Sequence, residues 1–357
     1  MKSSHRDDTV LLALSGGIDS AAAAVQLCRA GKKVIGVYML NSAQQAPDAD
    51  AKRVASQLGF ELIIFNAANK FEIIKNEFAA AYAAGRTPNP CVRCNQLIKF
   101  GSLFDIADSA GAGYLATGHY ARIFKNGESN YIARAKALGK DQSYVMFGIR
   151  RERLGRILFP NGQLQSKDAA RAIVKEAGLE IHNRAESQDI CFVPDGDYTS
   201  ILRERAERAL TPGAILDCDG RKLGEHNGYG LFTIGQRRGL RVAAGEPVYV
   251  CNINADKASV TLGPKEALLS TGLKASKANW LRDVPEIFDC GAQIRYGHKT
   301  TKARVRLLEE NEFEVHFSEP VFAVTPGQAV VLYDGDVLLG GGCIEYAIKD
   351  GADAGTI

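Results

Sequence analysis

The stretch "LLALSGGIDSAAAAVQL" (residues 11–27) decides the fold of the first half of the chain. It joins an apolar run, a Ser-Gly-Gly turn and an alanine-rich run, which predict a buried strand, a loop and a helix. Gly16 and Gly17 let backbone N–H groups approach a ligand closely, and the start of the helix adds positive potential. We therefore expect this loop to bind an anion.

The same loop favours one kind of phosphate chemistry over another. It lacks the Gly-Lys-Ser/Thr ending of a Walker loop, which argues against the usual site of γ-phosphate transfer. Its Ser-Gly-Gly-x-Asp-Ser pattern instead resembles the pyrophosphate loop of the PP-loop enzymes. Those enzymes split ATP to AMP and pyrophosphate and so activate an oxygen by adenylation. The alternative is that Ser15 and Asp19 only cap the helix.

Strands and helices alternate on either side of this loop. Besides residues 9–14, the runs 33–40, 61–66 and 114–119 have the composition of buried parallel strands, and amphipathic helical patterns separate them. This alternation predicts an α/β fold with a doubly wound parallel sheet, whose ligands bind at the carboxyl ends of the strands.

The second half of the chain has a different pattern. A charged helical linker (200–209) leads into glycine-rich sequence that contains several hairpins, such as "VVLYDGDVLLGGG" with its Asp-Gly turn. We therefore expect an ATP-binding domain at 1–203, a small central β-rich domain at 204–266 and a C-terminal β-barrel at 267–357.

Composition limits the class of protein. The chain has 357 residues, of which 46% are hydrophobic and 24% charged, and no apolar run reaches the roughly 20 residues that span a bilayer. The start "MKSSHRDDTV" has no apolar signal core, so a cytoplasmic protein without a membrane partner is expected. The eight cysteines are dilute, and the formal net charge of +3 does not identify a partner.

Two cysteines lie three positions apart in "TPNPCVRCNQLIKF" (87–100). The spacing of Cys91 and Cys94 fits three alternatives: half of a metal site, a redox pair, or one nucleophile next to a cysteine that takes no part in the reaction. A structural zinc site needs about four ligands, and the chain has only one Cys-x-x-Cys. A third candidate is Cys191, which lies among polar residues in "ESQDICFVPDG". The other five are expected to be buried and inert: Cys28, Cys218, Cys251, Cys290 and Cys343.

These thiols suggest what attacks an adenylated carbon. No segment that would supply ammonia is evident, whereas Arg93 and Lys99 stand close to the cysteine pair and would lower a thiol pKa. ATP activation combined with separated reactive thiols indicates sulfur transfer.

A basic segment in the second half indicates a nucleic-acid partner. "IRYGHKTTKARVRL" (294–307) carries five cations between 295 and 306 and no acid. On a strand, Lys302, Arg304 and Arg306 share one face. Such a strip suits RNA phosphates, and the alternative is an ordinary solvated strand face.

Long motifs throughout the chain resemble one family, the bacterial tRNA-specific 2-thiouridylases, which thiolate the wobble uridine of tRNAs for Lys, Glu and Gln. The similarity runs nearly end to end. It is carried by "SGGIDS", "GRTPNPCVRCNQLIKFG", "YLATGHYARI", "KDQSYVMF", "SQDICFVPDGDY", "GYGLFTIGQRRGL", "ANWL" and "PGQAVVLYDGD". One departure is Ala21, where the family usually has a second serine after "DS".

The resemblance implies roles for particular residues. ATP would lie against Ala13, Leu14, Ser15, Gly16, Gly17, Ile18, Asp19 and Ser20, with Met39 and Gly118 near the adenosine. Asn89, Pro90 and Cys91 would contact the target base. The tRNA would be contacted by His119, Lys140, Asp141, Gln142, Arg295, Tyr296 and Gln328. For His119 the alternative is an ordinary core histidine at the end of a buried strand.

The resemblance also implies a mechanism. A donor protein, either a cysteine desulfurase or a sulfur relay, loads a persulfide onto Cys191. ATP, with Mg²⁺ as counter-ion, adenylates the uridine, the persulfide delivers sulfur to carbon 2, and Cys94 is the nucleophile that releases the product. A catalytic disulfide between Cys94 and Cys191 results. Cys91 would line the base pocket or relay a proton, because relatives carry either Asp or Cys there.

Three alternatives stay open from the residues. A PP-loop ligase that amidates a small metabolite would explain the loop but not the thiols. A non-catalytic tRNA-binding or sulfur-carrier protein would leave "SGGIDS" unexplained. Finally, Cys91, Cys94 and Cys191 would be enough to hold an iron–sulfur cluster with one open iron; otherwise no resident metal is expected.

Overall fold

The computed structural model describes residues 8–42, 46, 48–183, 190–193, 196–242 and 246–349. The chain forms two compact units. The first comprises Met1–Ile73, Cys91–Gln188 and Asp336–Leu338, and the second comprises Ile74–Pro90, Asp189–Gly335 and Leu339–Ile357. Each unit has a hydrophobic core of its own.

The first unit is built on a parallel sheet. Its strands are β1 (Thr9–Ala13), β2 (Lys33–Leu40), β3 (Leu62–Asn66), β4 (Tyr114–Thr117) and β7 (Ile157–Leu158), in the order β3-β2-β1-β4-β7. Leu11 pairs with Ile35 on one side and with Leu115 on the other, and all these pairings are parallel. The predicted parallel sheet is confirmed.

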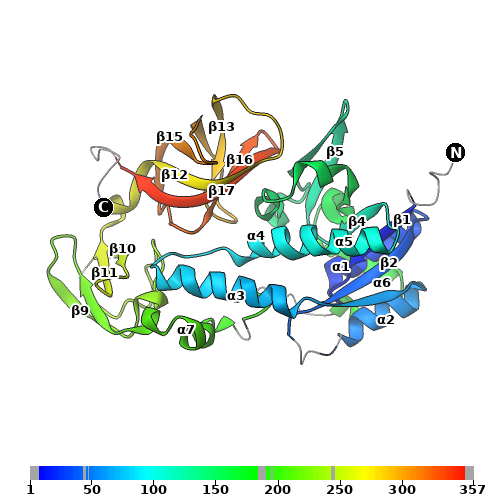
Figure 1. The fold of residues 1–357 in the computed structure, drawn as a ribbon, viewed down its shortest axis with the longest axis horizontal. Coiled ribbons are helices and arrows are strands. Elements are labelled where there is room, and N and C mark those ends of the chain that lie inside the picture. The colour runs from blue at the N-terminus through cyan, green and yellow to red at the C-terminus, as the bar shows by residue number, and fades with distance from the viewer. Residues whose placement is uncertain are drawn as a thin grey trace. The chain divides into compact units, whose positions relative to one another are not determined.

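Helices cover both faces of this sheet (Figure 1). On one face, α1 (Ile18–Arg29), α2 (Ala49–Leu58) and α6 (Lys167–Glu176) share a core with Val10 and Leu12. Leu11 is fully buried and points to the opposite face, because side chains alternate along a strand. On that face α5 (Leu103–Ser109) contacts β1 and β4. The sheet is therefore doubly wound, as the sequence predicted.

Shorter elements complete the first unit. A hairpin of β5 (Ala121–Asn126) and β6 (Ser129–Arg134) follows β4. The residue Val337 pairs with Ala133 of this hairpin. Ahead of α5, the helix α4 (Pro90–Cys94) runs into a π-helical segment, Asn95–Ser102. Short 3₁₀ helices lie at Leu138–Lys140, Ser143–Met146, Arg151–Arg156, Pro160–Gln163 and Glu180–Asn183.

The helix α3 (Ala68–Ala83) begins in the first unit and continues in the second from Ile74 onward. The second unit also contains the helix α7 (Thr199–Arg205) and 3₁₀ turns at Glu207–Leu210, Tyr229–Leu231 and Lys265–Leu268. Its central sheet has the order β10-β11-β8-β9. These strands are β8 (Gly213–Leu216), β9 (Lys222–His226), β10 (Tyr249–Asn254) and β11 (Ser259–Gly263). Phe78 and Tyr82 of α3 pack their rings against Tyr198 just before α7.

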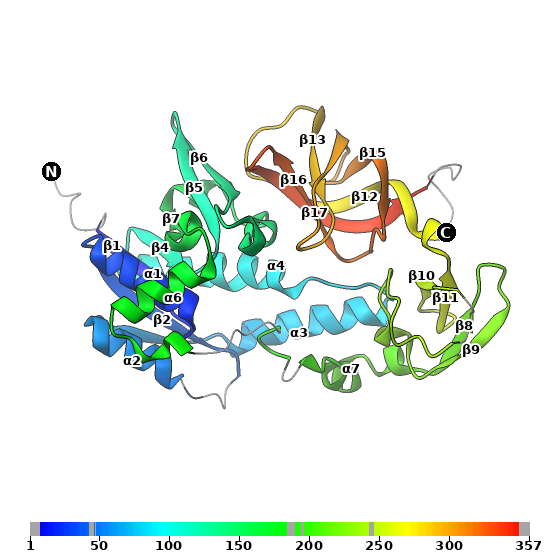
Figure 2. The same ribbon diagram turned by 180° about the vertical axis from the view of Figure 1, so that it is seen from behind.

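The last strands close into a barrel (Figure 2). They are β12 (Leu269–Trp280), β13 (Ile287–Gln293), β14 (Thr301–Leu307), β15 (Phe313–Phe322), β16 (Ala329–Asp334) and β17 (Val337–Ile348). The order is β12-β15-β14-β13-β16-β17, and β17 pairs back with β12. Fully buried Val305, Phe313 and Leu332 fill the interior. The C-terminal barrel is confirmed, and Asp334-Gly335 forms its last turn, with φ of 57° at Gly335.

None of the helices in the described ranges has the length and apolar character needed to cross a membrane.

Candidate active site

The Ser-Gly-Gly loop follows β1 at the point where the strand order reverses between β1 and β4. In an open α/β sheet this is where the carboxyl ends of two strands leave a crevice for a ligand. The loop is held to β2 by the N–H of Leu14, which donates to the carbonyl of Val37 at 2.9 Å. Met39 is half-buried near the end of β2. Loop and Met39 therefore lie at the same edge of the sheet.

Hydrogen bonds inside the loop fix its shape. The Ser20 hydroxyl donates to the carbonyl of Gly17 at 2.9 Å, so the Ser15 hydroxyl is the donor in the 3.1 Å bond between the two serines. Gly16 has φ of +80°, and a Cβ there would lie 2.7 Å from the Asp48 carboxylate. The N-cap residue of α1 is Gly17, and no side chain caps this helix end. The first N–H groups of α1 are therefore not capped by a side chain.

Asp19 does not cap the helix, and it contacts three residues from later parts of the chain. Its Oδ1 accepts a hydrogen bond from the Tyr120 hydroxyl at 2.9 Å, and its Oδ2 pairs with Lys167 Nζ at 3.3 Å. The fully buried Asn161 donates through Nδ2 to the carbonyls of Asp19 and Gly118, both at 2.8 Å. Asp19 thus links the loop to the start of α6. Because no side chain caps α1, the alternative that Asp19 only caps this helix is wrong.

Gly118 lies against the start of α1. A Cβ on it would stand 2.7 Å from both the Asp19 carbonyl carbon and the Ser20 nitrogen. Only glycine allows this close approach of two backbones. The structure therefore brings the predicted loop and Gly118 together. Sequence reasoning missed Tyr120, Asn161 and Lys167 as their partners, although Lys167 stands directly after the serine that caps α6.

The cysteine pair lies on an unusual helix. The segment Asn95–Ser102 is π-helical, and a π segment is rare outside functional sites. Its altered hydrogen-bond register is supported by Arg153, whose Nη1 donates to the carbonyls of Phe100 and Gly101 at 2.8 and 3.1 Å. Cys94 is 6% exposed, just before this segment, whereas Cys91 is exposed one turn earlier. The two thiols therefore have different access to solvent.

Lys99 of the π segment reaches the end of β4. Its Nζ lies 3.2 Å from Nε2 of His119, and Nδ1 of that ring lies 2.7 Å from Thr117 Oγ1. An ammonium group only donates, so Nε2 accepts and the ring proton is on Nδ1. Burial, with a smaller contribution from Lys99, holds the pKa of His119 well below 6.5. His119 is therefore a neutral histidine with both nitrogens engaged.

Lys99 affects Cys91 as well, but not as strongly as expected. Although the Cys91 side chain is exposed, the protein atoms around it partly desolvate the thiol and raise its pKa from 9.0, and the opposing effect of Lys99 is smaller. The expectation that nearby cations would lower the thiol pKa is therefore wrong for Cys91. A thiol with a raised pKa is a poor nucleophile, which agrees with its predicted role beside the target base.

The low pKa of His119 predicts a pH dependence of stability. As the pH falls, the His119 imidazole of the unfolded chain, with an ordinary pKa of 6.5, becomes protonated before the imidazole of the folded protein does. The contribution of His119 to the free energy of unfolding is complete above pH 6.5 and is lost as the pH falls from there towards the lowered pKa. Denaturant unfolding of wild type and His119→Gln between pH 7.5 and 5 should show a shallower loss in the variant. Parallel curves would contradict the assignment.

The three residues of "KDQ" at 140–142 differ in their contacts: two make hydrogen bonds within the protein and one lines a cavity. Asp141 pairs with Arg134 at 3.1 Å, accepts the backbone N–H of Ala135 at 2.8 Å and has a side chain only 6% exposed. The side-chain oxygen of Gln142 accepts the N–H of Tyr120 at 2.9 Å. Both side chains therefore organise the protein in this structure. Lys140 lines a cavity instead.

In the second unit, Gln328 holds the segment that leads to Asn89 and Pro90. Its amide nitrogen donates to the carbonyls of Thr87 and Pro88 at 2.9 and 3.3 Å. The adjacent Gly327 has φ of +90°, and a Cβ there would lie 2.9 Å from the carbonyl oxygen of Thr87. Two groups of predicted residues, Gln328 and Asn89-Pro90, thus belong to one local arrangement.

The other residues predicted to contact tRNA in this unit differ in exposure. Arg295 donates through Nη2 to Thr325 Oγ1 at 2.9 Å, whereas Tyr296 is 50% exposed. On β14 the side chains of Lys302, Arg304 and Arg306 are exposed and alternate with buried ones, as predicted. However, Arg304 makes two hydrogen bonds to Asp289 on β13, and Arg306 pairs with Glu314 on β15 at 2.6 Å. The strip is therefore less positive than its sequence suggested.

The remaining thiols depart from expectation. None of the five cysteines predicted to be buried is fully buried, and Cys218 is exposed. Burial nevertheless raises the pKa of Cys251 to about 11 and of Cys290 to about 12. It also raises the pKa of Cys28 and Cys343 from 9.0. The prediction of burial was wrong, although these four raised pKa values agree with low reactivity.

Cys191 is exposed and belongs to the second unit, whereas Cys94 belongs to the first. The residues around it, 184–189 and 194–195, lie outside the described ranges. Within the described part of the chain, no group of three or more His, Cys, Asp or Glu is placed to hold a metal ion. The iron–sulfur alternative therefore gains no support.

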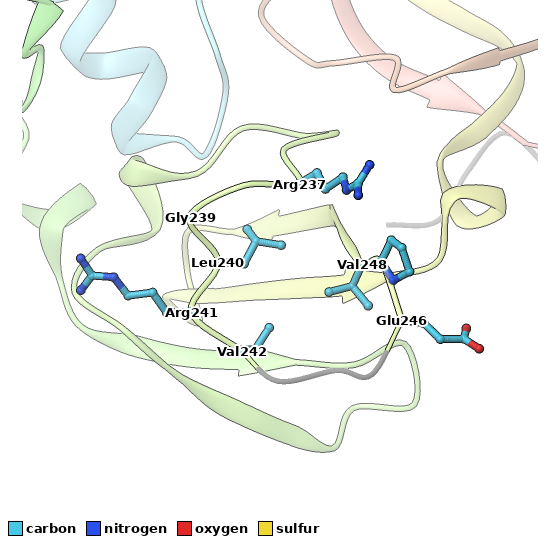
Figure 3. Close-up of a pocket in the computed structure, with 8 residues that line it drawn as sticks. Arg237, Gly239, Leu240, Arg241, Val242, Glu246 and Val248 are labelled. Carbon is cyan, nitrogen blue, oxygen red and sulfur yellow. The ribbon is translucent and has the colours of Figure 1, made fainter.

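A pocket of about 290 Å³ occupies the central module of the second unit (Figure 3). Leu240, Val242 and Val248 point into the space between their loops, with two arginines and Glu246 around them. It is lined by Arg237, Gly239, Leu240, Arg241, Val242, Glu246, Pro247 and Val248. None of the predicted site residues lines it.

Comparison with known proteins agrees with this arrangement. Residues 8–195 match the model of the tRNA methyl transferase HUP domain, residues 200–264 that of the tRNA methyl transferase PRC-barrel domain, and residues 270–344 that of the aminomethyltransferase beta-barrel domain. The tRNA-specific 2-thiouridylase of Geotalea uraniireducens is 41% identical over 368 residues, which cover 98% of each chain. This chain belongs to the tRNA-specific 2-thiouridylase family. The predicted family and enzyme class are thereby confirmed.

Other members of the family are similar over the same extent. The 2-thiouridylase of Roseiflexus sp. is 43% identical over 369 residues, covering 94% of this chain and 98% of that one. Among solved structures, an NMN synthetase from Francisella tularensis is 17% identical and covers 51% of this chain and 68% of its own. Its TM-score of 0.34 is too low to support a conclusion.

Proposed function

We propose that this protein transfers persulfide sulfur to carbon 2 of the wobble uridine of tRNA, in a reaction driven by ATP. The observation that carries the proposal is the anion-binding loop at the carboxyl end of β1, in a chain about 41% identical over nearly its whole length to 2-thiouridylases. The tRNAs for Lys, Glu and Gln are the proposed substrates, and a cysteine desulfurase or sulfur relay is the proposed donor.

The first step is adenylation. The uridine oxygen on carbon 2 attacks the α-phosphorus of ATP, pyrophosphate leaves, and the oxygen then carries AMP. Gly16, Gly17 and the start of α1 offer N–H groups to the phosphate charge that develops. Mg²⁺ would accompany ATP as its counter-ion. Adenylation turns a carbonyl oxygen into a leaving group, which makes carbon 2 susceptible to sulfur.

Two thiols carry out the second half of the reaction. The outer sulfur of a persulfide on Cys191 attacks carbon 2, and AMP leaves with the oxygen. Cys94 then attacks the disulfide to Cys191, or removes the sulfur as hydrosulfide before it attacks carbon 2. In both cases the bound sulfur ends on uridine and Cys94 is joined to Cys191, so two electrons must be supplied by a reductant before the next cycle.

The remaining residues would position the RNA. Asn89, Pro90 and Cys91 are proposed to contact the base, and the β-rich part of the chain to hold the tRNA through Arg295, Tyr296 and Gln328. The anticodon loop is single-stranded, so its base can be turned out into a pocket. We retain 1–203, 204–266 and 267–357 as the proposed division into an ATP-binding domain, a central module and a tRNA-binding barrel.

Mass spectrometry of anticodon nucleosides tests this function. After incubation with ATP, tRNA and a persulfide source, we expect 2-thiouridine at the wobble position, with AMP formation that depends on tRNA. Consumption of ATP without tRNA, with amidation of a small molecule, would favour the ligase alternative. Binding of tRNA with no consumption of ATP would favour a non-catalytic carrier.

The basic strip on β14 is expected to contribute modestly to tRNA binding. We expect the triple variant Lys302→Glu, Arg304→Glu, Arg306→Glu to weaken binding and to flatten the dependence of log affinity on log salt by about 0.7–0.9 for each lost phosphate contact. The loss should correspond to about one contact rather than three, because Asp289 and Glu314 already pair with the arginines. The exposed Lys257→Glu is the control for net charge. An unchanged salt slope would mean that the strip is only a solvated face.

A further inference from the structure

Residues 84–90, the connecting segment, join the end of α3 to the residues proposed to contact the target base. Between positions 86 and 89 the segment forms neither helix nor strand, and Pro88 and Pro90 have no backbone N–H group to donate. The whole segment belongs to the second unit. Its path therefore depends on contacts from other parts of that unit.

The end of α3 fixes the start of the connecting segment. Gly85 has φ of +71°, and its N–H donates to the carbonyl of Tyr82 at 2.9 Å, which ends the helix. The carbonyl of Ala83 accepts a hydrogen bond from the Tyr229 hydroxyl at 2.8 Å. A Cβ on Gly85 would lie 3.2 Å from the carbonyl oxygen of Ile253 on β10. The central module therefore holds the segment where it leaves the helix.

Arg86 attaches the connecting segment to the barrel. Its Nη1 donates to Oε2 of Glu345 on β17 at 2.6 Å, and its Nη2 donates to the carbonyl of Ile344 at 2.9 Å. The other oxygen of Glu345, Oε1, accepts a hydrogen bond from the Ser276 hydroxyl on β12. The Arg86 and Glu345 side chains are 30% and 27% exposed, and partial burial strengthens the attraction between the two charges. Two strands of the barrel therefore fix the guanidinium group.

The residue after Arg86 is held through its backbone. The N–H of Thr87 donates to the carbonyl of Pro326 at 2.9 Å, and the carbonyl of Thr87 accepts from the Gln328 amide at 2.9 Å. Arg86 differs from Thr87 because its own side chain makes the contact. A substitution at Arg86 therefore removes a charged anchor three positions before Asn89 and leaves these backbone contacts in place.

We propose that Arg86, acting through Glu345, is a positioning residue that fixes the connecting segment so that Asn89 and Pro90 meet the target base. The proposal rests on the base contact that the proposed function assigns to these two residues. A base turned out of the anticodon loop must be held in one orientation for carbon 2 to react, and a misplacement of about 1 Å can lower a rate about 100-fold. The guanidinium group is engaged with the barrel, so Arg86 acts on the reaction through the segment rather than by binding RNA.

Rates of thiolation at saturating tRNA, with the Kd for tRNA measured separately, test this role. Arg86→Gln should lower kcat about 10- to 100-fold, because the segment loses its anchor, and should leave Kd within about 2-fold of wild type. Arg86→Lys keeps a charge that can pair with Glu345 but lacks the planar fork, so it should recover part of kcat. Lys274→Gln is the matched control. It removes a 2.7 Å ion pair to Glu312 in the same barrel, between side chains 24% and 31% exposed, and should resemble wild type.

Photo-cross-linking measures the position of the base without catalysis. The full-length protein is irradiated with tRNA that carries 5-bromouridine at the wobble position, and mass spectrometry identifies the attached peptide. In wild type we expect attachment within residues 86–91, and Arg86→Gln should lose most of this product although it binds the same amount of tRNA. Glu345→Gln removes the charge that pairs with Arg86 and should have the same effects, so it replaces Arg86→Gln if thermal unfolding shows that variant to be unfolded.

The outcomes separate this inference from the proposed function. An unchanged kcat and cross-link yield in both variants overturns it, and so does a loss of rate matched by equal weakening of tRNA binding, because Arg86 would then contact RNA. An equal loss of rate in Lys274→Gln would reveal a general effect of stability and would also overturn it. Attachment elsewhere in wild type would contradict both the base contact and this inference. If wild type forms no 2-thiouridine, the proposed function fails, whereas the cross-link still decides whether Arg86 places the segment against the base.

Discussion

Cys94→Ser and Cys191→Ser are each expected to abolish 2-thiouridine formation, with losses of about 1,000-fold or more. A serine hydroxyl can neither carry a persulfide nor attack a disulfide. Because Cys94 and Cys191 act in different steps, the two variants should stop at different points. Cys94→Ser should still accept a persulfide on Cys191, whereas Cys191→Ser should not, and both should still form AMP when tRNA is present.

Cys91→Ser should slow thiolation without abolishing it. Its thiol has a raised pKa, and its proposed role beside the base is one that a polar side chain can fill. Cys218→Ser is the matched control, because Cys218 is exposed like Cys191 but is not part of the proposed site. Nucleoside mass spectrometry and persulfide labelling measure these differences. If Cys91→Ser is as inactive as the other two, the cysteine pair acts together, and a redox or cluster site becomes the better hypothesis.

Asp19→Ala is expected to reduce AMP formation by about 100-fold or more, the loss typical of removing one preorganised electrostatic group. The carboxylate accepts a hydrogen bond from the Tyr120 hydroxyl and positions Lys167 beside the loop. Without it, Lys167 loses its anchor and the loop loses its link to α6. The side chain is 36% exposed, so its removal leaves no buried cavity and the fold should persist.

Thin-layer analysis of labelled ATP measures this effect and also identifies the products. Wild type should form AMP and pyrophosphate, because the loop lacks a Walker lysine. Tyr120→Phe removes only one hydrogen bond to Asp19 and should reduce turnover much less than Asp19→Ala. Circular dichroism and thermal unfolding verify that each variant is folded. ADP and phosphate as products would refute the adenylation step.

The sequence was sufficient for those features that depend on short-range patterns. Apolar runs of strand length, such as 33–40, specify buried strands, because each residue's environment follows from its neighbours two positions away. Gly16 and Gly17 mark the loop, because glycine is the residue that lets backbone approach a ligand closely. The alternation around Ala303 and Val305 likewise identified which side of β14 faces solvent. Motifs of this length also sufficed to identify the family.

Side-chain partners from distant parts of the chain could not be predicted in this way. Tyr120 contacts Asp19 from 101 positions away, and Asn161 contacts it from 142 positions away. Lys302, Arg304 and Arg306 form a strip of three cations in the sequence, yet Asp289 and Glu314 on neighbouring strands pair with two of them. In the same way, desolvation of the Cys91 thiol by the surrounding protein atoms outweighs the effect of Lys99, eight residues further along, so the pKa of Cys91 rises.

The sequence by itself therefore determined the doubly wound sheet, the barrel and the family, and it supplied the Ser-Gly-Gly loop and the cysteines as hypotheses to be tested. Periodicity, glycines and motif spacing act within a few residues, and they have the same meaning wherever the segment lies. Only the tertiary structure decided that Asp19 anchors Lys167 and that His119 is neutral. Charge pairing and desolvation depend on which segments the fold brings within about 4 Å of each other.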